Sequence, residues 1–230
     1  MPDALQEGLR RQLEALEAKI AGGEALAGWK VGLTSGQSRD AMGRGFRPFG
    51  YVLESRVFDS GASLSLADFT AIGVENEVCF TVGETIRSDG TDVDRERVGR
   101  ALAGASPGFE INEPRLPRDA STTDRLADNL SQWGIVAGPP RPVADIDFEA
   151  LEVTLSRDGE PVQAVAAAGH IDDHFVSIAA LAVQLGRFGL ALEAGQRVIT
   201  GAFGRSPVSA PSRWRGEFGA VLGTVEVTFT

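Results

Sequence analysis

The stretch "IGVENEVCFTV", residues 72–82, is the strongest local indication of the fold. Its apolar residues extend almost without interruption, which is typical of a central strand. Glu75 and Glu77 interrupt the run, and side chains two residues apart in a strand share one face. Two ionised carboxylates on an apolar strand need a positive partner, either a metal ion or a lysine. The alternative is a half-buried strand whose glutamates face water.

Two more charged residues lie in similar apolar surroundings elsewhere in the chain. Glu110 lies in "PGFEIN" (107–112), and Lys30 lies in "GWKVGL" (28–33). Glu110 could instead begin a surface turn, and the long side chain of Lys30 could reach water. Charges in several apolar strand segments together favour a common interior site. Because carboxylate oxygens suit hard cations, that site favours Mg²⁺ or Mn²⁺ over zinc or copper.

The remaining pattern predicts a β-rich α+β domain. Apolar residues at intervals of three and four predict a helix from Leu5 to Ile20 that ends at Gly22 and Gly23. A short helix is expected over 94–104, and the apolar run 175–188 predicts a buried helix capped by Asp172 or Asp173. Strands are expected at 28–35, 51–58, 107–111, 133–138, 196–203, 212–218 and 222–229, with a hairpin at Asp158-Gly159 and a loop or broken helix over 117–129.

Composition narrows the class of protein. The 230 residues carry a formal net charge of -10, which argues against nucleic-acid binding and against docking on an anionic membrane. The single cysteine, Cys79, excludes an intramolecular disulfide and a thiolate zinc site, and its strand position predicts a buried, inert thiol. The charged N-terminal segment does not resemble a signal peptide, and no apolar run is long enough to span a membrane. A cytoplasmic protein is the simplest expectation.

Several segments, taken in order, resemble one known family. They are "GWKVGLTS", "IGVENEVCF", "PGFEINEPRL", "LADNLSQWGIVAG", "AGQRVITGAF" and "GEFGAVLGTVEVTF". This order is similar to that of the 2-oxopent-4-enoate hydratase/4-oxalocrotonate decarboxylase family, in the fumarylacetoacetate hydrolase superfamily. The resemblance implies a catalytic mixed β-roll over residues 71–230, preceded by a small helix and strand region over 1–70.

The same resemblance implies a divalent-metal lyase of aromatic-compound catabolism. Glu75, Glu77 and Glu110 would hold Mg²⁺ or Mn²⁺, and Lys30 would be the catalytic residue beside the substrate. Lys30 would also bind the substrate, together with Asn129, Thr200 and Gly201. The implied reaction is hydration of a small 2-hydroxydienoate or 2-oxo acid. A decarboxylase, a C–C hydrolase or a non-catalytic partner subunit are the alternatives. Relatives are homo-oligomers, and some pair with another enzyme of their pathway.

Two departures from the family pattern bear on the reaction. The hydratases commonly carry an acid in a "P-D-F-G" loop, whereas this chain has "GFRPFGYV", with Pro48 at that place and Arg47 before it. The family turn "G-H-P-L-N-S" is replaced by the longer "GHIDDHFVS", in which either His170 or His174 could match the histidine. These changes affect positions that the family pattern links to hydration, whereas the three glutamates expected to bind the metal are all present.

Overall fold

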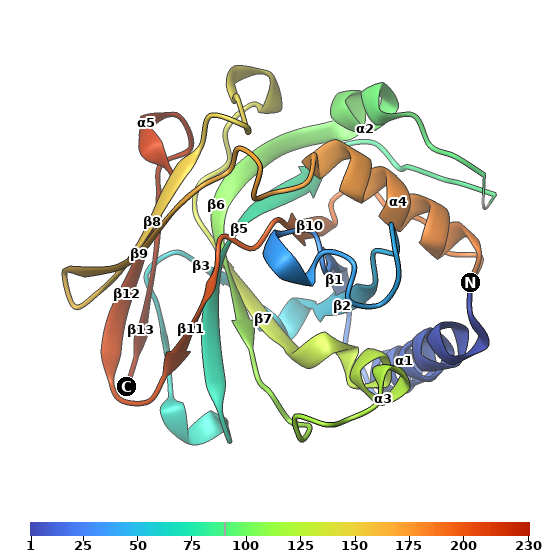
Figure 1. Ribbon diagram of the computed structural model, residues 1–230, viewed down its shortest axis with the longest axis horizontal. Coiled ribbons are helices and arrows are strands. Elements are labelled where there is room, and N and C mark those ends of the chain that lie inside the picture. Colours follow the sequence, from blue (N-terminus) through green and yellow to red (C-terminus); the bar gives the residue numbers. More distant parts are fainter. Residues whose placement is uncertain (90) are drawn as a thin grey trace.

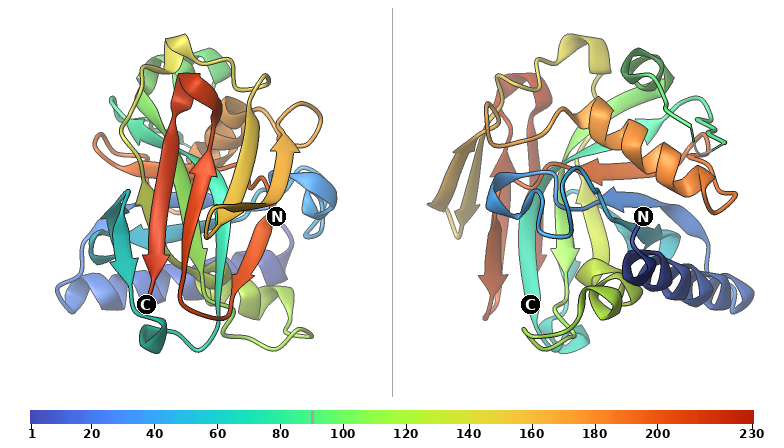
Figure 2. Two further views of the ribbon diagram at one scale, coloured as in Figure 1. Left: turned by 90° about the vertical axis from the view of Figure 1, so that its left-hand side faces the viewer. Right: turned by 45° about the vertical axis from the view of Figure 1, so that its right-hand side comes forward.

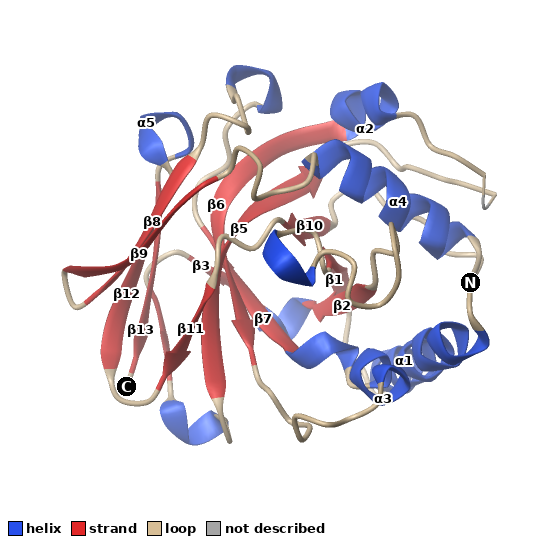
Figure 3. Ribbon diagram, in the orientation of Figure 1, coloured by secondary structure: helices blue, strands red, loops and turns tan. Residues whose placement is uncertain are grey.

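The structure is a computed structural model that describes residues 1–89 and 91–230. It contains two β-sheets, and its two longest helices lie at the right in Figures 1 and 3. The larger sheet has the strand order β2-β1-β10-β5-β6-β7-β3, and β11 also pairs with β5. The smaller sheet has the order β4-β13-β12-β8-β9 and crosses the front of the molecule in Figure 2, left. This arrangement confirms the expected α+β class.

The strands are β1 (Leu26–Val31), β2 (Phe49–Leu53), β3 (Val57–Asp59), β4 (Ala62–Leu64), β5 (Ile72–Val82), β6 (Leu102–Asn112), β7 (Gln132–Ala137), β8 (Glu152–Arg157), β9 (Glu160–Ala166), β10 (Arg197–Thr200), β11 (Arg205–Val208), β12 (Ser212–Glu217) and β13 (Thr224–Phe229). The α-helices are α1 (Asp3–Ala21), α2 (Arg95–Ala101), α3 (Thr122–Ala127), α4 (His174–Gly186) and α5 (Gly219–Leu222).

Strand β5 is the centre of the larger sheet and begins and ends where the sequence predicted. It pairs antiparallel with β6 along most of its length on one edge. On the other edge it pairs with β10 through residues 78–81 and with β11 through residues 72–75. On this second edge, β5 therefore has no strand partner at Asn76 and Glu77. Between β10 and β11, the Phe203 N–H donates to the Asn76 carbonyl over 2.9 Å.

The apolar core lies on the face of β5 that carries Val74, Val78 and Phe80, all fully buried. Asp173, one of the two expected caps, is the N-cap of helix α4. The rings of His174 and Phe175, in the first turn of this helix, pack near Phe80. A smaller apolar cluster on the opposite face includes Cys79, Ile135 and Ile199. Cys79 is buried, as expected, and burial raises the pKa of its thiol to about 11.

Several expected elements have different bounds in the structure, and two of them show the reason. The predicted strand 51–58 is divided into β2 and β3 by a 3₁₀ turn over Glu54–Arg56, because β2 pairs with β1 while β3 pairs with β7. The predicted helix 94–104 ends at Ala101, since Leu102 already pairs with Val82 as β6 begins. Sheet hydrogen bonds with distant partners override the local pattern at both places.

The segment 1–70 contributes to both sheets. Its strands β1, β2 and β3 belong to the larger sheet, and β4 pairs with β13 in the smaller one. Helix α1 packs against α3, which forms within the segment 117–129 and is capped by Ser121. No helix in the described part of the chain is both long and apolar enough to span a membrane.

Candidate metal centre

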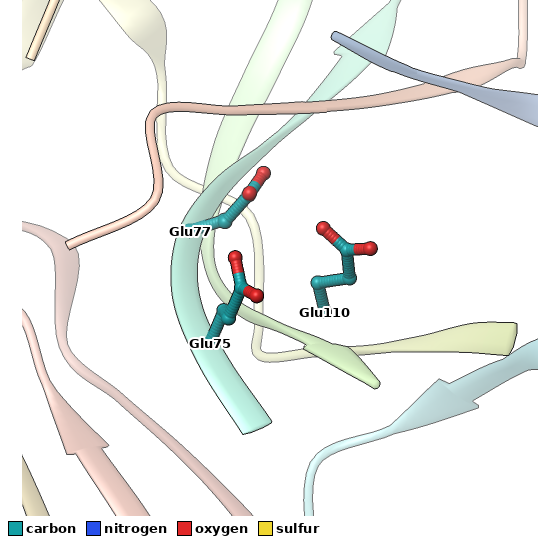
Figure 4. Close-up of side chains that lie close together, drawn as sticks. All are labelled: Glu75, Glu77 and Glu110. Atoms are coloured by element: carbon teal, nitrogen blue, oxygen red, sulfur yellow. The ribbon is translucent and has the colours of Figure 1, made fainter. Parts of the chain in front are cut away.

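Two paired strands bring the three predicted glutamates together. Glu75 lies directly opposite Glu110 in the β5–β6 register, and Glu77 follows two residues along β5 on the same face. One carboxylate oxygen from each of the three lies within 4.8 Å of the others (Figure 4). The expected convergence of Glu75, Glu77 and Glu110 is therefore present in the fold.

Lys30 lies on β1, which β10 separates from β5 in the strand order, and its side chain reaches this cluster at Glu110. Its Nζ donates a short hydrogen bond to Glu110 Oε1, with which it forms a buried ion pair. It donates a second hydrogen bond, of 3.1 Å, to the Leu130 carbonyl. An ammonium group has three N–H donors. Among the described residues, two of them have these partners, so one remains for a ligand.

The cluster carries more negative charge than its surroundings neutralise. Burial, followed by repulsion from Glu110, raises the pKa of Glu75 to about 7. Burial and repulsion from Glu110 and Glu75 raise the pKa of Glu77 well above its usual value. Burial alone would lower the pKa of Lys30, but the nearby carboxylates outweigh it and raise that pKa. The lysine therefore keeps its proton and offsets only part of the negative charge.

The donor atoms fit a divalent cation. Glu77 Oε2 is buried and has no hydrogen-bond partner within the described residues. A buried carboxylate oxygen without a partner is costly, and a cation would supply the missing interaction. All the candidate ligand atoms are carboxylate oxygens, which suits a hard ion such as Mg²⁺ or Mn²⁺.

Glu75 marks the solvent side of the cluster. Its side chain is 19% exposed, compared with 3% for Glu110. Asn112 Nδ2 donates to Glu75 Oε1 over 2.8 Å, and Arg205 Nε lies 3.7 Å from the same oxygen. Sequence reasoning missed both neighbours. Asn112 could have been found from its position two residues after Glu110, but nothing local placed Arg205 here.

The side chain of Asn129 binds the backbone of β2. Its amide oxygen accepts from Tyr51 N–H over 2.8 Å, and its amide nitrogen donates to the Tyr51 carbonyl over 2.9 Å. These bonds hold the segment Asn129–Ser131, in which all three residues have positive φ, against β2. The carbonyl of Leu130 is thereby directed at Lys30. The side chain of Asn129 thus fixes this loop, and both its amide oxygen and its amide nitrogen already have a hydrogen-bond partner.

Thr200 and Gly201 lie at the end of β10. Thr200 pairs with Val78, so its side chain shares the face of Val78, opposite to the carboxylates. Gly201 has φ +86°, and its N–H donates to Thr34 Oγ1 over 3.0 Å. A Cβ at Gly201 would lie 2.5 Å from the His174 ring, so no larger residue fits.

The two histidines have different surroundings. His174 is buried among Phe80 and Phe148, and burial lowers its pKa to about 4. His170 contributes its backbone carbonyl, which accepts from Gly36 N–H and from Arg39. Within the described residues, neither ring belongs to the carboxylate cluster, so the altered turn brings no histidine into it.

The loop in which Pro48 stands at the place of the family acid is linked to Asp172 through Arg39 and Arg47. Asp172 accepts from Arg47 over 2.8 Å and pairs with Arg39 over 2.6 Å. The Pro48 carbonyl accepts from Gly32 N–H over 2.8 Å. Asp172 is therefore paired with two guanidinium groups.

Solved structures share this fold. The 4-oxalocrotonate decarboxylase of Pseudomonas putida G7, complexed with magnesium and adipate, matches with a TM-score of 0.87 at 23% identity, covering 95% of this chain and 83% of that one. A fumarylacetoacetate hydrolase family protein of Yersinia pestis CO92 matches with a TM-score of 0.72 at 18% identity, covering 90% and 94%. The fold is therefore the mixed β-roll of the fumarylacetoacetate hydrolase superfamily, as expected.

Curated relatives narrow the class further. The 2-keto-4-pentenoate hydratase of Burkholderia vietnamiensis is 32% identical over 213 residues, covering 90% of this chain and 79% of the relative. The 2-hydroxyhexa-2,4-dienoate hydratase of Comamonas testosteroni is 28% identical over 236 residues, covering 98% and 86%. No protein-family model matches the chain. The chain belongs to the 2-keto-4-pentenoate hydratase/4-oxalocrotonate decarboxylase family, whose named relatives are lyases.

Proposed function

We propose that this protein is a divalent-metal-dependent lyase that adds water to a small 2-hydroxy-2,4-dienoate. With 2-hydroxypenta-2,4-dienoate, one water molecule would be added and 4-hydroxy-2-oxopentanoate formed. The observation that carries the proposal is the convergence of Glu75, Glu77 and Glu110 within 4.8 Å beside Lys30. The activity of the named hydratase relatives supports the same reaction class.

The glutamates hold the cation in this proposal. A divalent cation bound by Glu75, Glu77 and Glu110 would supply Lewis-acid stabilisation of the negative charge that develops on the 2-oxo oxygen. The buried positions of Glu77 and Glu110 keep water away from two of the carboxylates. The more exposed Glu75 leaves one side from which a small acid can enter.

Lys30 is the group that holds and moves a proton. It stays charged among the carboxylates, and its remaining N–H can donate to the substrate. Converting the dienol to its 2-oxo form requires a proton at carbon, and water addition requires further proton transfer. Glu110 and the Leu130 carbonyl orient the ammonium for this work. Asn129 acts indirectly, by fixing the position of Leu130.

Decarboxylation is the second candidate reaction. Pro48 stands at the place of the hydratase loop acid, and Asp172 is held by Arg39 and Arg47. Losing that acid would impair water addition more than loss of CO₂, since decarboxylation needs only stabilisation of the resulting negative charge. A 4-oxalocrotonate decarboxylase of Pseudomonas is among the relatives, at 28% identity over 86% of this chain.

Three further properties belong to the proposal. Mg²⁺ is the expected native ion, with Mn²⁺ as the alternative, because both accept oxygen-only ligation. A homo-oligomer is expected by analogy with relatives of this fold. The enzyme is expected to work in the cytoplasm on a small 2-oxo acid.

Two assays test the proposal. The purified protein is incubated with Mg²⁺ and 2-hydroxypenta-2,4-dienoate while the dienol absorbance is followed, and then with 4-oxalocrotonate while CO₂ is measured. Loss of dienol with formation of the 4-hydroxy product supports hydration, and CO₂ release supports decarboxylation. Chelation should abolish either activity. A protein that binds Mg²⁺ but converts neither compound would refute the catalytic proposal and favour a partner subunit.

A further inference from the structure

Arg205 is placed beside the carboxylate cluster by strand pairing. It begins β11 and lies directly opposite Glu75 in the β11–β5 register, so both side chains occupy one face. Its Nε lies 3.7 Å from Glu75 Oε1. Within the described residues, Glu75 is the only acidic partner with which it forms an ion pair.

The backbone of β5 leaves room for this guanidinium. A Cβ at Gly73 would lie 2.6 Å from Arg205 Nε and 2.7 Å from Asn112 Oδ1. The glycine therefore lets Arg205 lie across β5 next to Asn112, which itself holds Glu75. The side chain of Arg205 is 45% exposed and that of Glu75 is 19% exposed, so solvent reaches both partners of this ion pair.

The charge balance gives Arg205 a specific role. The carboxylates of Glu75, Glu77 and Glu110, with the ammonium of Lys30, leave two negative charges, which a divalent cation would cancel. Such a loaded cluster is neutral and has no net attraction for an anion. Arg205 makes it positive by one charge, which matches a substrate with a single carboxylate. A guanidinium also pairs with carboxylates in a bidentate geometry.

We infer that Arg205 is a specificity-determining residue that binds the carboxylate next to the 2-oxo group of the substrate. The inference rests on the proposed function and assigns a residue that sequence reasoning did not find. The 3.7 Å ion pair with Glu75 is longer than a good charge-assisted hydrogen bond. The guanidinium can therefore turn to an incoming carboxylate without breaking a tight bond.

A binding experiment tests this role without turnover. The probe is 2-oxopentanoate, which has the 2-oxo acid group but no double bond to hydrate. Its dissociation constant is measured by calorimetry at saturating Mg²⁺ for the wild type, Arg205→Gln, Arg205→Lys and a matched control, Arg213→Gln. Arg213 is an exposed arginine of β12 that pairs with Glu226. The Mg²⁺ dissociation constant is measured for each protein without the acid.

The expected loss is selective for the acid. Arg205→Gln should weaken 2-oxopentanoate binding by about 10- to 100-fold, the usual range for removing a charge-assisted partner. Its Mg²⁺ affinity should stay the same or rise, because a positive charge near Glu75 is gone. Arg205→Lys should recover part of the acid affinity, and Arg213→Gln should match the wild type. In turnover assays, Arg205→Gln should raise KM far more than it lowers kcat.

Other outcomes separate the two proposals. Acid affinity in Arg205→Gln within about twofold of the wild type would overturn the role of Arg205 while leaving the proposed function intact. Parallel losses of acid and Mg²⁺ affinity would also overturn it, because Arg205 would then act only by holding Glu75 in place. A Mg²⁺-loaded wild type that neither binds 2-oxopentanoate nor converts a dienoate would overturn both.

Discussion

Replacing Glu77 by glutamine should have opposite effects on the metal-free and metal-bound protein. Glu77 is buried, its Oε2 has no partner within the described residues, and its carboxylate lies near those of Glu75 and Glu110. Two unit charges within 4.8 Å of each other repel by about 3.5 kcal/mol or more at an effective dielectric constant of 20. The neutral amide removes this repulsion and also removes an attraction for the cation.

The effect of Glu77→Gln should differ in size between the metal-free and the metal-bound protein. Because the pKa of Glu77 is raised well above its usual value, proton uptake already relieves part of the repulsion in the metal-free protein. We therefore expect Glu77→Gln to raise the free energy of unfolding of the metal-free protein by only about 1–2 kcal/mol. The lost attraction should weaken Mg²⁺ binding by about 100-fold, which corresponds to about 3 kcal/mol.

Urea denaturation in the presence of a chelator, or of about 5 to 10 mM Mg²⁺, measures the free energy of unfolding of the metal-free and the metal-bound protein. Calorimetry gives the Mg²⁺ dissociation constant directly. The control is Glu217→Gln, which removes an exposed glutamate of β12 paired with Arg215 over 2.9 Å. This control should change neither quantity by much, because exposed ion pairs contribute little. If Glu77→Gln destabilises the metal-free protein and keeps its Mg²⁺ affinity, the glutamate is a structural residue and the reasoning fails.

Three further changes test other parts of the site. Lys30→Met removes the proton carrier, so kcat should fall by about 100-fold or more while Mg²⁺ binding persists; an unchanged kcat would exclude Lys30 from proton transfer. Asn129→Ala breaks both bonds to Tyr51 and should lower the free energy of unfolding in urea by about 2 kcal/mol; lost substrate affinity at unchanged stability would instead indicate direct binding. Burial holds the pKa of His174 at about 4, below its unfolded value near 6.5, so the unfolded state takes up the proton first as the pH falls. Between pH 7 and pH 5 this should cost the wild type about 2 kcal/mol of stability that His174→Gln does not lose, and equal slopes in urea unfolding would contradict the assignment.

The central strand and the shared direction of its glutamates were predictable from the sequence. Alternation along a strand is a property of local backbone geometry, so residues 75 and 77 had to share a face once 72–82 was a strand. The apolar surroundings of Lys30 and Glu110 correctly indicated that both charges turn inward. The identity of the ligand atoms, and hence the class of metal ion they suit, also follows from residue types alone.

Distant strand pairing determined the rest of the site. The strand register sets Glu75 opposite Glu110, 35 residues later in the chain, and opposite Arg205, 130 residues later. The local sequence pattern does not predict pairing between such distant residues. The same pairing turns the side chain of Thr200 away from the carboxylates. Tertiary contacts also fixed the loop at Asn129, whose positive φ is stabilised by hydrogen bonds to β2. Sequence thus determined which charged groups are buried, whereas the hydrogen-bonded register between remote strands decided which of them meet.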